Sequence, residues 1–533
     1  MAAWHSSASK LNVSPSSAPV CILLIFSFLV ALHRFAGGRL RSRLGSRLPL
    51  PPGPKPLPII GNAADVPTTM MAQRFKEMTD KHGEVVYLNA LGQPMIILGS
   101  HEAALELLDK RTANYSDRQP SAMRELAGWE WTFVLMPYGL PWRRRRKELH
   151  QFFHPNAILQ HQPLQQREAL KFLKNVIEKP DTFSHQVRHS FASTIMRIAY
   201  GIKVIDEKDP YVEAIEAGSA AFTEAFVPGA FLVDTFPILR HIPGWFPGAE
   251  FKQKAAAWKK IAHNMRDAPF EMTMESLVKG TAERSIATTI IEKARRKECS
   301  DISAEKIIAR DVSALAYAAG ADTTISTVQT FFLAMTCYPE VQAKARAELD
   351  TVVGSTRLPT FEDRGSLPYI TAVAKESIRW QSVAPLGIPH RSLEDDEFRG
   401  YFIPKGSAVI ANLYAFSRDP RVYPDPETFD PERFLKDGKI NPDVQDPSTF
   451  AFGYGRRICP GRHFAEASLF IIIASVLHTL TIDYAVDDGG KLIIPEVKMT
   501  DGVLSYPLPF PCSIKPRSPE HIQLVHTGLA QPD

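Results

Sequence analysis

The ten residues from Phe452 to Gly461, FGYGRRICPG, constrain this chain more than any other stretch. A lone cysteine, Cys459, follows two glycines and two arginines and precedes a proline and a third glycine. A cysteine acts as a metal ligand or nucleophile only where its thiolate charge is stabilised, as at the amides of a helix N-terminus. The next segment, His463–Leu480, predicts a helix that begins just after Cys459. We therefore expect backbone amides to point at the Cys459 sulfur.

The other residues of this segment suit a flat, anionic ligand. Gly455 and Gly461 would let the backbone approach such a ligand closely, and Arg457 offers a fixed positive charge for an anionic group. A metal held by one thiolate, with a planar anionic macrocycle supplying its other ligands, is haem. The sequence therefore predicts Cys459 as the ligand of a haem iron. The alternative is a buried, inert cysteine in a glycine-rich turn.

The segment also carries a family resemblance. It matches the pattern F-x-x-G-x-R-x-C-x-G at Phe452, Gly455, Arg457, Cys459 and Gly461, and so resembles the haem-binding segment of cytochromes P450. The resemblance implies an α+β, mainly α fold: the cytochrome P450 fold, with a long central helix over the haem and a small β-rich subdomain. It covers nearly the whole chain, and Pro389–Phe434 looks most similar to fungal P450s of secondary metabolism, akin to the O-methylsterigmatocystin oxidoreductase group.

Composition narrows the possible classes. The chain has 533 residues, 44% of them hydrophobic, and no internal repeat, which favours one large catalytic unit over residues 63–533. A net charge of +4 is small for this length and gives no reason to expect a nucleic-acid partner. Five widely spaced cysteines predict a reducing compartment, with neither a disulfide framework nor a zinc site.

The N-terminus predicts a membrane anchor. Residues 19–36, PVCILLIFSFLVALHRFA, would span roughly 27 Å as a helix, close to a thin bilayer core. Arginines are dense after this stretch and cations are few before it, which predicts a retained single-pass signal anchor in the endoplasmic reticulum membrane, with the catalytic domain cytosolic. Residues 1–18 would form a short lumenal tail and residues 37–62 a basic, proline-rich hinge. A cleaved signal peptide is the alternative.

Local patterns predict several elements of the catalytic unit. A long helix is expected over Ser303–Cys337, because acidic residues stand at its start and Pro339 follows its end. Pro368 opens another helix, and a hairpin is expected from strands Glu84–Ala90 and Pro94–Ser100.

The resemblance extends to a charged network. Glu376 and Arg379, in ESIR, match the family's E-x-x-R, and Arg433, in PERF, would complete a buried Glu-Arg-Arg network behind the haem. Without the resemblance, ESIR reads as an ordinary surface pair.

The segment Ala319–Thr324, AGADTT, sets poor helix formers inside the long predicted helix, and such local inconsistencies favour function. It resembles the P450 oxygen-activation motif, in which the helix loosens beside the haem and an acid-alcohol pair relays protons. Asp322 and Thr323 match that pair as catalytic residues. The alternative is a threonine that bonds back to the preceding turn.

The run Trp142–His150, WRRRRKELH, could be a nuclear-localisation signal or a solvated helix face. The resemblance implies instead that Trp142 and Arg146, and also His390, contact the haem propionates, while neighbouring cations dock an acidic reductase.

The resemblance also implies the chemistry. A thiolate ligand on haem b favours O–O bond cleavage, and the sequence contains no dinucleotide-binding fingerprint. Electrons from NADPH would therefore come through a separate membrane partner, NADPH-cytochrome P450 reductase, with cytochrome b5 as a further candidate. Two alternatives are a haem-thiolate isomerase or dehydratase that does not use O2, and a haem-binding protein without turnover.

The substrate is expected to be hydrophobic: a terpenoid is favoured, with a polyketide or indole scaffold as the alternatives. The expected pocket residues are mostly apolar and could also be core residues. The wall that the resemblance implies comprises Met123, Leu126, Trp129, Trp131, Phe133, Val312, Ala316, Ala319, Gly320, Ala384, Leu386, Ile388, Val503 and Leu504.

Overall fold

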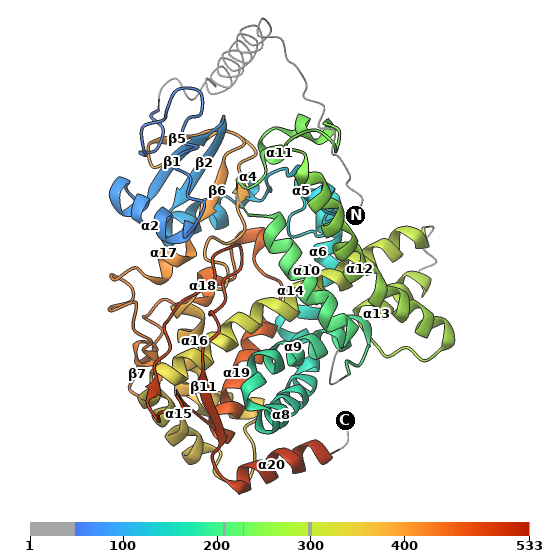
Figure 1. Cartoon of the computed structure of the whole chain (residues 1–533), viewed down its shortest axis with the longest axis vertical. Helices are drawn as coiled ribbons and strands as arrows, with labels where there is room; N and C mark the ends of the chain where they lie inside the picture. The colour runs from blue at the N-terminus through green and yellow to red at the C-terminus, as the bar shows by residue number, and fades with distance from the viewer. Residues whose placement is uncertain (1–47, 206–208, 228, 297–300, 532–533) are drawn as a thin grey trace, which may run out of the picture.

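The computed structural model describes residues 48–205, 209–227, 229–296 and 301–531 (Figure 1). The predicted lumenal tail and anchor, residues 1–36, lie outside this part of the chain. None of the helices in the described ranges combines the length and apolar character needed to cross a bilayer.

The described part of the predicted hinge lies against the folded domain. The Phe402 amide donates to the Pro49 carbonyl at 2.8 Å, and the Tyr87 amide donates to the Pro52 carbonyl at 2.9 Å. Residues 48–62 therefore pack along strands instead of standing apart from them.

A single long helix, α14 (Ile302–Cys337), passes through the middle of the helical region (Figure 1). The sequence predicted it one residue shorter, from Ser303. Asp301 caps its start, because the Asp301 side chain accepts a hydrogen bond from the Ala304 amide at 3.0 Å. Most of its residues are buried, as expected for a helix that is packed on every side.

Other helices surround α14, and α9 packs along it. Pro368 occupies the first turn of α16, as predicted. The remaining helices are α2 (Met71–His82), α3 (His101–Ala104), α4 (Thr112–Tyr115), α5 (Ala122–Leu126), α6 (Leu140–Phe153), α7 (Pro155–Ile158), α8 (Gln162–Glu178), α9 (Phe183–Tyr200), α10 (Pro210–Ala225), α11 (Leu232–Thr235), α12 (Glu250–Lys279), α13 (Ile286–Arg296), α15 (Pro339–Val352), α16 (Pro368–Trp380), α17 (Leu413–Ser417), α18 (Ser448–Ala451), α19 (Arg462–Thr479) and α20 (Pro519–Ala530).

In the described ranges the strands form four separate sheets, of which the four-stranded one lies at one end of the molecule, whereas β7 and β11 lie toward the other end (Figure 1). The four-stranded sheet has the order β1-β2-β6-β3, in which β2 and β6 are parallel and the other neighbours are antiparallel. The strands are β1 (Val85–Ala90), β2 (Gln93–Leu98), β3 (His390–Arg391), β4 (Asp396–Phe398), β5 (Tyr401–Ile403), β6 (Ala408–Ala411), β7 (Leu435–Lys436), β8 (Lys439–Ile440), β9 (Leu480–Val486), β10 (Leu492–Ile493) and β11 (Cys512–Pro516).

The predicted hairpin is confirmed as β1 and β2, which pair from Val85 with Leu98 to Ala90 with Gln93. Leu91 and Gly92 connect them with φ of 51° and 87°, the left-handed pair that a tight two-residue hairpin turn requires. The mainly helical fold with small sheets is confirmed as well.

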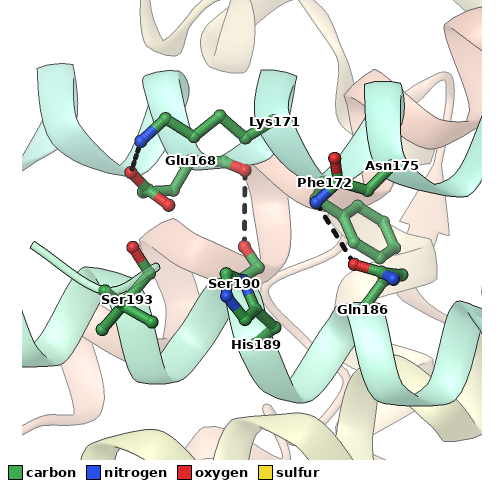
Figure 2. A pocket seen from close by; sticks show the side chains of 9 residues that line it. Glu168, Lys171, Phe172, Asn175, Gln186, His189, Ser190 and Ser193 are labelled. Atoms are coloured by element: carbon green, nitrogen blue, oxygen red, sulfur yellow. Dashed lines mark hydrogen bonds and ion pairs between the residues drawn. The ribbon is translucent and has the colours of Figure 1, made fainter. Parts of the chain in front are cut away.

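Helices α8 and α9 meet across a small polar pocket (Figure 2). Lys171 pairs with Glu168 at 2.7 Å, and Asn175 Nδ2 donates to Gln186 Oε1 at 3.2 Å. The pocket holds about 10 Å³, room for about one water. Across it, the Asn175–Gln186 hydrogen bond and that of Ser190 Oγ to the Glu168 carbonyl at 3.4 Å join α9 to α8.

Candidate active site

One large cavity of about 390 Å³ lies between α14 and the segment that contains Cys459. Its wall also includes residues from α6, α9 and α10, from the segment that follows α16, and from the C-terminal turn that contains Val503 and Leu504.

Cys459 sits at this wall immediately before α19. The amides of Gly461 and Arg462 bond to its sulfur, as the sequence predicted, and they lower the pKa of the Cys459 thiol, as do the charges of Arg146 and Arg462. Burial is the larger effect and leaves that pKa raised. The Cys459 amide donates to the Phe452 carbonyl at 2.7 Å and closes the loop. These amides give the sulfur donors that would support a metal-bound thiolate.

Gly455 has a different role from the expected one. Its φ is +54°, and a Cβ there would lie 2.5 Å from the Leu108 carbonyl oxygen and 2.6 Å from Thr112 Oγ1. Its amide donates to Asp109 Oδ1 at 2.8 Å. Gly455 therefore seats the cysteine loop on the π-helix η1 (Leu105–Lys110) and is absent from the cavity wall.

Phe452 and Gly461 do line the cavity. A Cβ on Gly461 would lie 3.9 Å from the Cys459 sulfur, which is ordinary contact. Of the two glycines expected to approach a flat ligand, the wall contains Gly461.

Arg457 is buried at the cavity wall. Its Nε donates to the Ser116 carbonyl at 2.7 Å and its Nη2 to the Met136 carbonyl at 2.8 Å. Its guanidinium carbon lies 4.3 Å from the centre of the Trp142 ring, a cation-π contact that fixes both side chains. Burial lowers the pKa of Arg457 to about 10, so this position favours a nearby anion.

A second buried cation, Arg118, lies close to Arg457. Its Nη1 donates to the carbonyls of Ile388 and Pro389 at 2.7 and 2.9 Å. Burial and the charge of Arg457 lower its pKa. Arg118 lines the cavity, yet no motif around it marked it in the sequence.

Two further predicted contacts lie on the same wall. His390 Nδ1 lies 2.6 Å from the Tyr115 carbonyl, and burial together with Arg118 lowers the pKa of His390. Arg146 Nη2 donates to the Ile458 carbonyl at 2.6 Å.

The donors and charges of the cavity fit the expected haem. Haem offers an iron that accepts a thiolate and two carboxylates that require cations. The cavity wall carries the Cys459 sulfur together with Arg118, Arg146, Arg457 and His390.

On α14, the segment Ala319–Thr324 is continuous α-helix, so the predicted loosening is absent. Thr323 Oγ1 donates to the Ala319 carbonyl at 2.9 Å, the back-bonding anticipated as the alternative, and so satisfies a carbonyl within the turn. A Cβ on Gly320 would lie 3.0 Å from Ile195 Cδ1. Gly320 therefore also allows α9 to pack closely on α14.

Asp322 and Thr323 both line the cavity but do not bond to each other in this structure. Arg188 Nη1 donates to Asp322 Oδ1 at 3.1 Å, and the Tyr506 hydroxyl donates to Oδ2 at 2.5 Å. Nothing in the local sequence identified Arg188 or Tyr506, since each lies far from Asp322 along the chain.

Glu376, Arg379 and Arg433 meet in a buried network. Arg379 contacts the two Glu376 carboxylate oxygens with two hydrogen bonds of 2.7 Å, and Arg433 Nε reaches Oε1 at 3.2 Å. Arg379 also donates to the carbonyls of Ser417 and Pro426 at 2.8 Å. The network thereby ties α16 to the chain that leads toward Cys459.

Ten of the residues expected in the pocket wall are found there, and four lie behind it. Met123, Trp131 and Val312 are buried in the core cluster around α14, and Leu126 packs against that cluster. The side chains of Trp129 and Phe222 meet edge to face at 5.1 Å in the wall. The expected residues found in the wall are Trp129, Phe133, Ala316, Ala319, Gly320, Ala384, Leu386, Ile388, Val503 and Leu504.

Comparison with known proteins agrees with this geometry. A family model described as Cytochrome P450 matches residues 51–509. The cytochrome P450 monooxygenases COX2 and COX1 of Coprinopsis cinerea are 43% and 40% identical to this chain, over 93% and 95% of it and 94% and 98% of their own lengths. The tryptamine 4-monooxygenase of Psilocybe cyanescens is 40% identical over 95% of this chain and 99% of its own length. The chain therefore belongs to the cytochrome P450 family and is a monooxygenase of that family.

Proposed function

We propose that this monooxygenase oxidises a neutral, hydrophobic small molecule, with a terpenoid as the favoured class. The observation that carries the proposal is one cavity in which the Cys459 sulfur and the pair Asp322 and Thr323 share a largely apolar wall. Apolar walls draw a ligand out of water in proportion to its apolar surface.

Haem b is the cofactor of this proposal. Cys459 would hold the iron, and Arg457, Arg118, Arg146 and His390 would neutralise the propionates, with Trp142 fixing Arg457. When bound, thiolate-ligated haem iron supplies the reductive activation of O2. The Glu376 network would hold the cysteine loop in place from behind.

The acid-alcohol pair would deliver protons into the cavity. Thr323 already carries a hydroxyl at the wall, and Asp322 is joined through Arg188 to Glu216, a half-exposed residue on α10. To pass a proton to Thr323, the Asp322 carboxylate has to break its hydrogen bond with Arg188 or Tyr506, because these occupy both of its oxygens.

The wall disfavours a cationic amine. Asp322 is the one carboxylate among the described residues of the wall, and Arg188 already neutralises it. A protonated amine would therefore be desolvated without a partner. Because one relative is a tryptamine 4-monooxygenase, an indole scaffold is an alternative to a terpenoid or polyketide.

Electrons would come from NADPH through a separate NADPH-cytochrome P450 reductase, with cytochrome b5 as a second candidate donor. Arg143, Arg144 and Lys147 are exposed on α6, the helix that also contains Trp142 and Arg146. Such cations steer an acidic partner toward the haem side. Residues 19–36 would hold the enzyme in the endoplasmic reticulum membrane beside that reductase.

The test is a feeding experiment with microsomes that contain the full chain and a fungal reductase, supplied with NADPH and ¹⁸O₂. Neutral sesquiterpenes, aromatic polyketides and tryptamine are offered in parallel, and products are identified by mass spectrometry, with Cys459→Ala as the control. A labelled terpenoid product supports the proposal. Labelled hydroxytryptamine alone would overturn the substrate class, and an unlabelled, rearranged product would indicate an isomerase or dehydratase.

A further inference from the structure

The side chain of Asp322 is held from two directions. Arg188 on α9 binds Oδ1 and Tyr506 binds Oδ2, while the carboxylate itself is 3% exposed. Arg188 has a second acidic partner, because its Nε lies 3.3 Å from Glu216 Oε1. If Asp322 turned away, Arg188 would keep Glu216, whereas the Tyr506 hydroxyl has Asp322 as its one hydrogen-bond partner in the described ranges. Tyr506 is therefore the more specific of the two restraints.

Tyr506 belongs to a tight turn that is fastened to α14. Its amide donates to Thr500 Oγ1 at 2.9 Å, and the Thr500 amide donates to the Tyr506 carbonyl at 2.7 Å. One residue earlier, the Ser505 carbonyl accepts from Ser326 Oγ at 2.5 Å, and the Ser505 amide donates to the Val383 carbonyl at 2.8 Å. The turn is therefore attached to α14 at Ser505.

The same turn supplies part of the cavity wall. Val503 and Leu504 line the cavity, and Leu504 precedes Tyr506 by two residues. Gly502 lies at the start of the turn, and a Cβ added there would lie 3.3 Å from Thr223 of α10, so the turn also packs closely on α10. A ligand that presses on Val503 or Leu504 therefore pushes on the segment that holds the Asp322 carboxylate.

We propose that Tyr506 is a positioning residue for Asp322 and couples this acid to occupancy of the cavity through Val503 and Leu504. The inference rests on the proposed proton-delivery role of Asp322. In this structure the Tyr506 hydroxyl binds the Asp322 carboxylate, which does not bond to Thr323. A ligand that shifts the turn weakens this hydrogen bond, and the carboxylate turns toward Thr323. Burial and the charge of Asp322 raise the pKa of Tyr506, so its hydroxyl keeps the proton that it donates.

The experiment compares Tyr506→Phe with Tyr484→Phe in the full-length holoenzyme. Tyr484, on β9, is a matched control. Its hydroxyl donates to the Cys337 carbonyl at 3.4 Å, and Tyr484 is not part of the described cavity wall. Hydrogen exchange of peptides covering residues 500–508 is measured first. Loss of a hydrogen bond to a charged group is expected to speed exchange there by about tenfold in Tyr506→Phe, and Tyr484→Phe should leave it unchanged.

The second readout is peroxide released per NADPH by the reconstituted enzyme and reductase without added substrate. Tyr506→Phe is expected to lower peroxide release per NADPH severalfold and to change its solvent isotope effect, since the freed acid delivers the protons that cleave the O–O bond. In an Asp322→Asn background, Tyr506→Phe should add nothing. Faster exchange with unchanged peroxide release and isotope effect would overturn the coupling and leave Tyr506 a structural residue. If Asp322→Asn itself changes neither quantity, the proton-delivery proposal fails, and the inference fails with it.

Discussion

Arg379 and Glu376 face each other one helical turn apart on α16, joined by two hydrogen bonds of 2.7 Å, and neither side chain is exposed to solvent. Arg433 adds a second cation to the same carboxylate at 3.2 Å. Removing the carboxylate would leave two buried guanidinium groups without their counter-ion.

Glu376→Ala is therefore expected to destabilise the fold by about 3–5 kcal/mol, the usual effect of breaking a buried pair. We also expect loss of haem incorporation, measured from the carbon monoxide difference spectrum, together with a lower Tm. Glu432→Ala is the matched control, because Glu432 forms an exposed pair with Lys344. A normal yield of haem protein from Glu376→Ala would contradict the structural role.

Gly455→Ala should impair the cysteine loop in two ways. A left-handed backbone costs an alanine about 1–2 kcal/mol, and the new Cβ would meet the Leu108 carbonyl oxygen. Gly438 has φ of +72° with no atom within 4 Å of its added Cβ, so Gly438→Ala measures the backbone cost alone. We expect reduced haem incorporation for Gly455→Ala only, and equal effects of the two variants would show that the Leu108 contact is unimportant.

Thr323→Ala should uncouple NADPH use from product and increase peroxide release, because the wall would lose the hydroxyl of the acid-alcohol pair. Thr351 is an exposed threonine on α15 with the same back-bond, to the Ala347 carbonyl at 2.8 Å. Thr351→Ala therefore controls for loss of such a bond. Unchanged coupling in Thr323→Ala would remove the proton-delivery assignment.

Gly320→Ala tests the contact between α9 and α14. Alanine favours a helix by about 1 kcal/mol over glycine, but its Cβ would press on Ile195. We expect the single variant to gain little or to lose stability, and the double variant with Ile195→Val to recover the helix gain. Chemical denaturation of all four proteins measures this coupling, and strict additivity would argue against the contact.

Asn114 stands in the sequence NYS and provides a test of topology. A cytosolic catalytic domain predicts no glycan there. A glycosidase-sensitive mass shift traced to Asn114 would overturn the predicted orientation.

Features fixed by local signals could be predicted from the sequence. Pro368 and Pro339 mark helix boundaries, two short apolar runs on either side of Leu91-Gly92-Gln93 mark the hairpin, and the spacing around Cys459 indicates the site. Arg118 and Tyr506 could not be found this way, because their roles come from contacts with residues far away in the chain. Met123 and Trp131 were expected in the wall from the family resemblance, but they fill the core, and an apolar residue looks the same in sequence in either place.

The uninterrupted helix α14 carries both the wall residues and the acid-alcohol pair on one rigid rod of 36 residues, about 54 Å long. An insertion or deletion of one residue would rotate everything beyond it by about 100° and carry Asp322 and Thr323 out of place. Changes of chain length that alter the substrate range are therefore better tolerated outside α14. The loops that supply Phe133, Ile388 and Leu504 can change length and sequence without moving this rod.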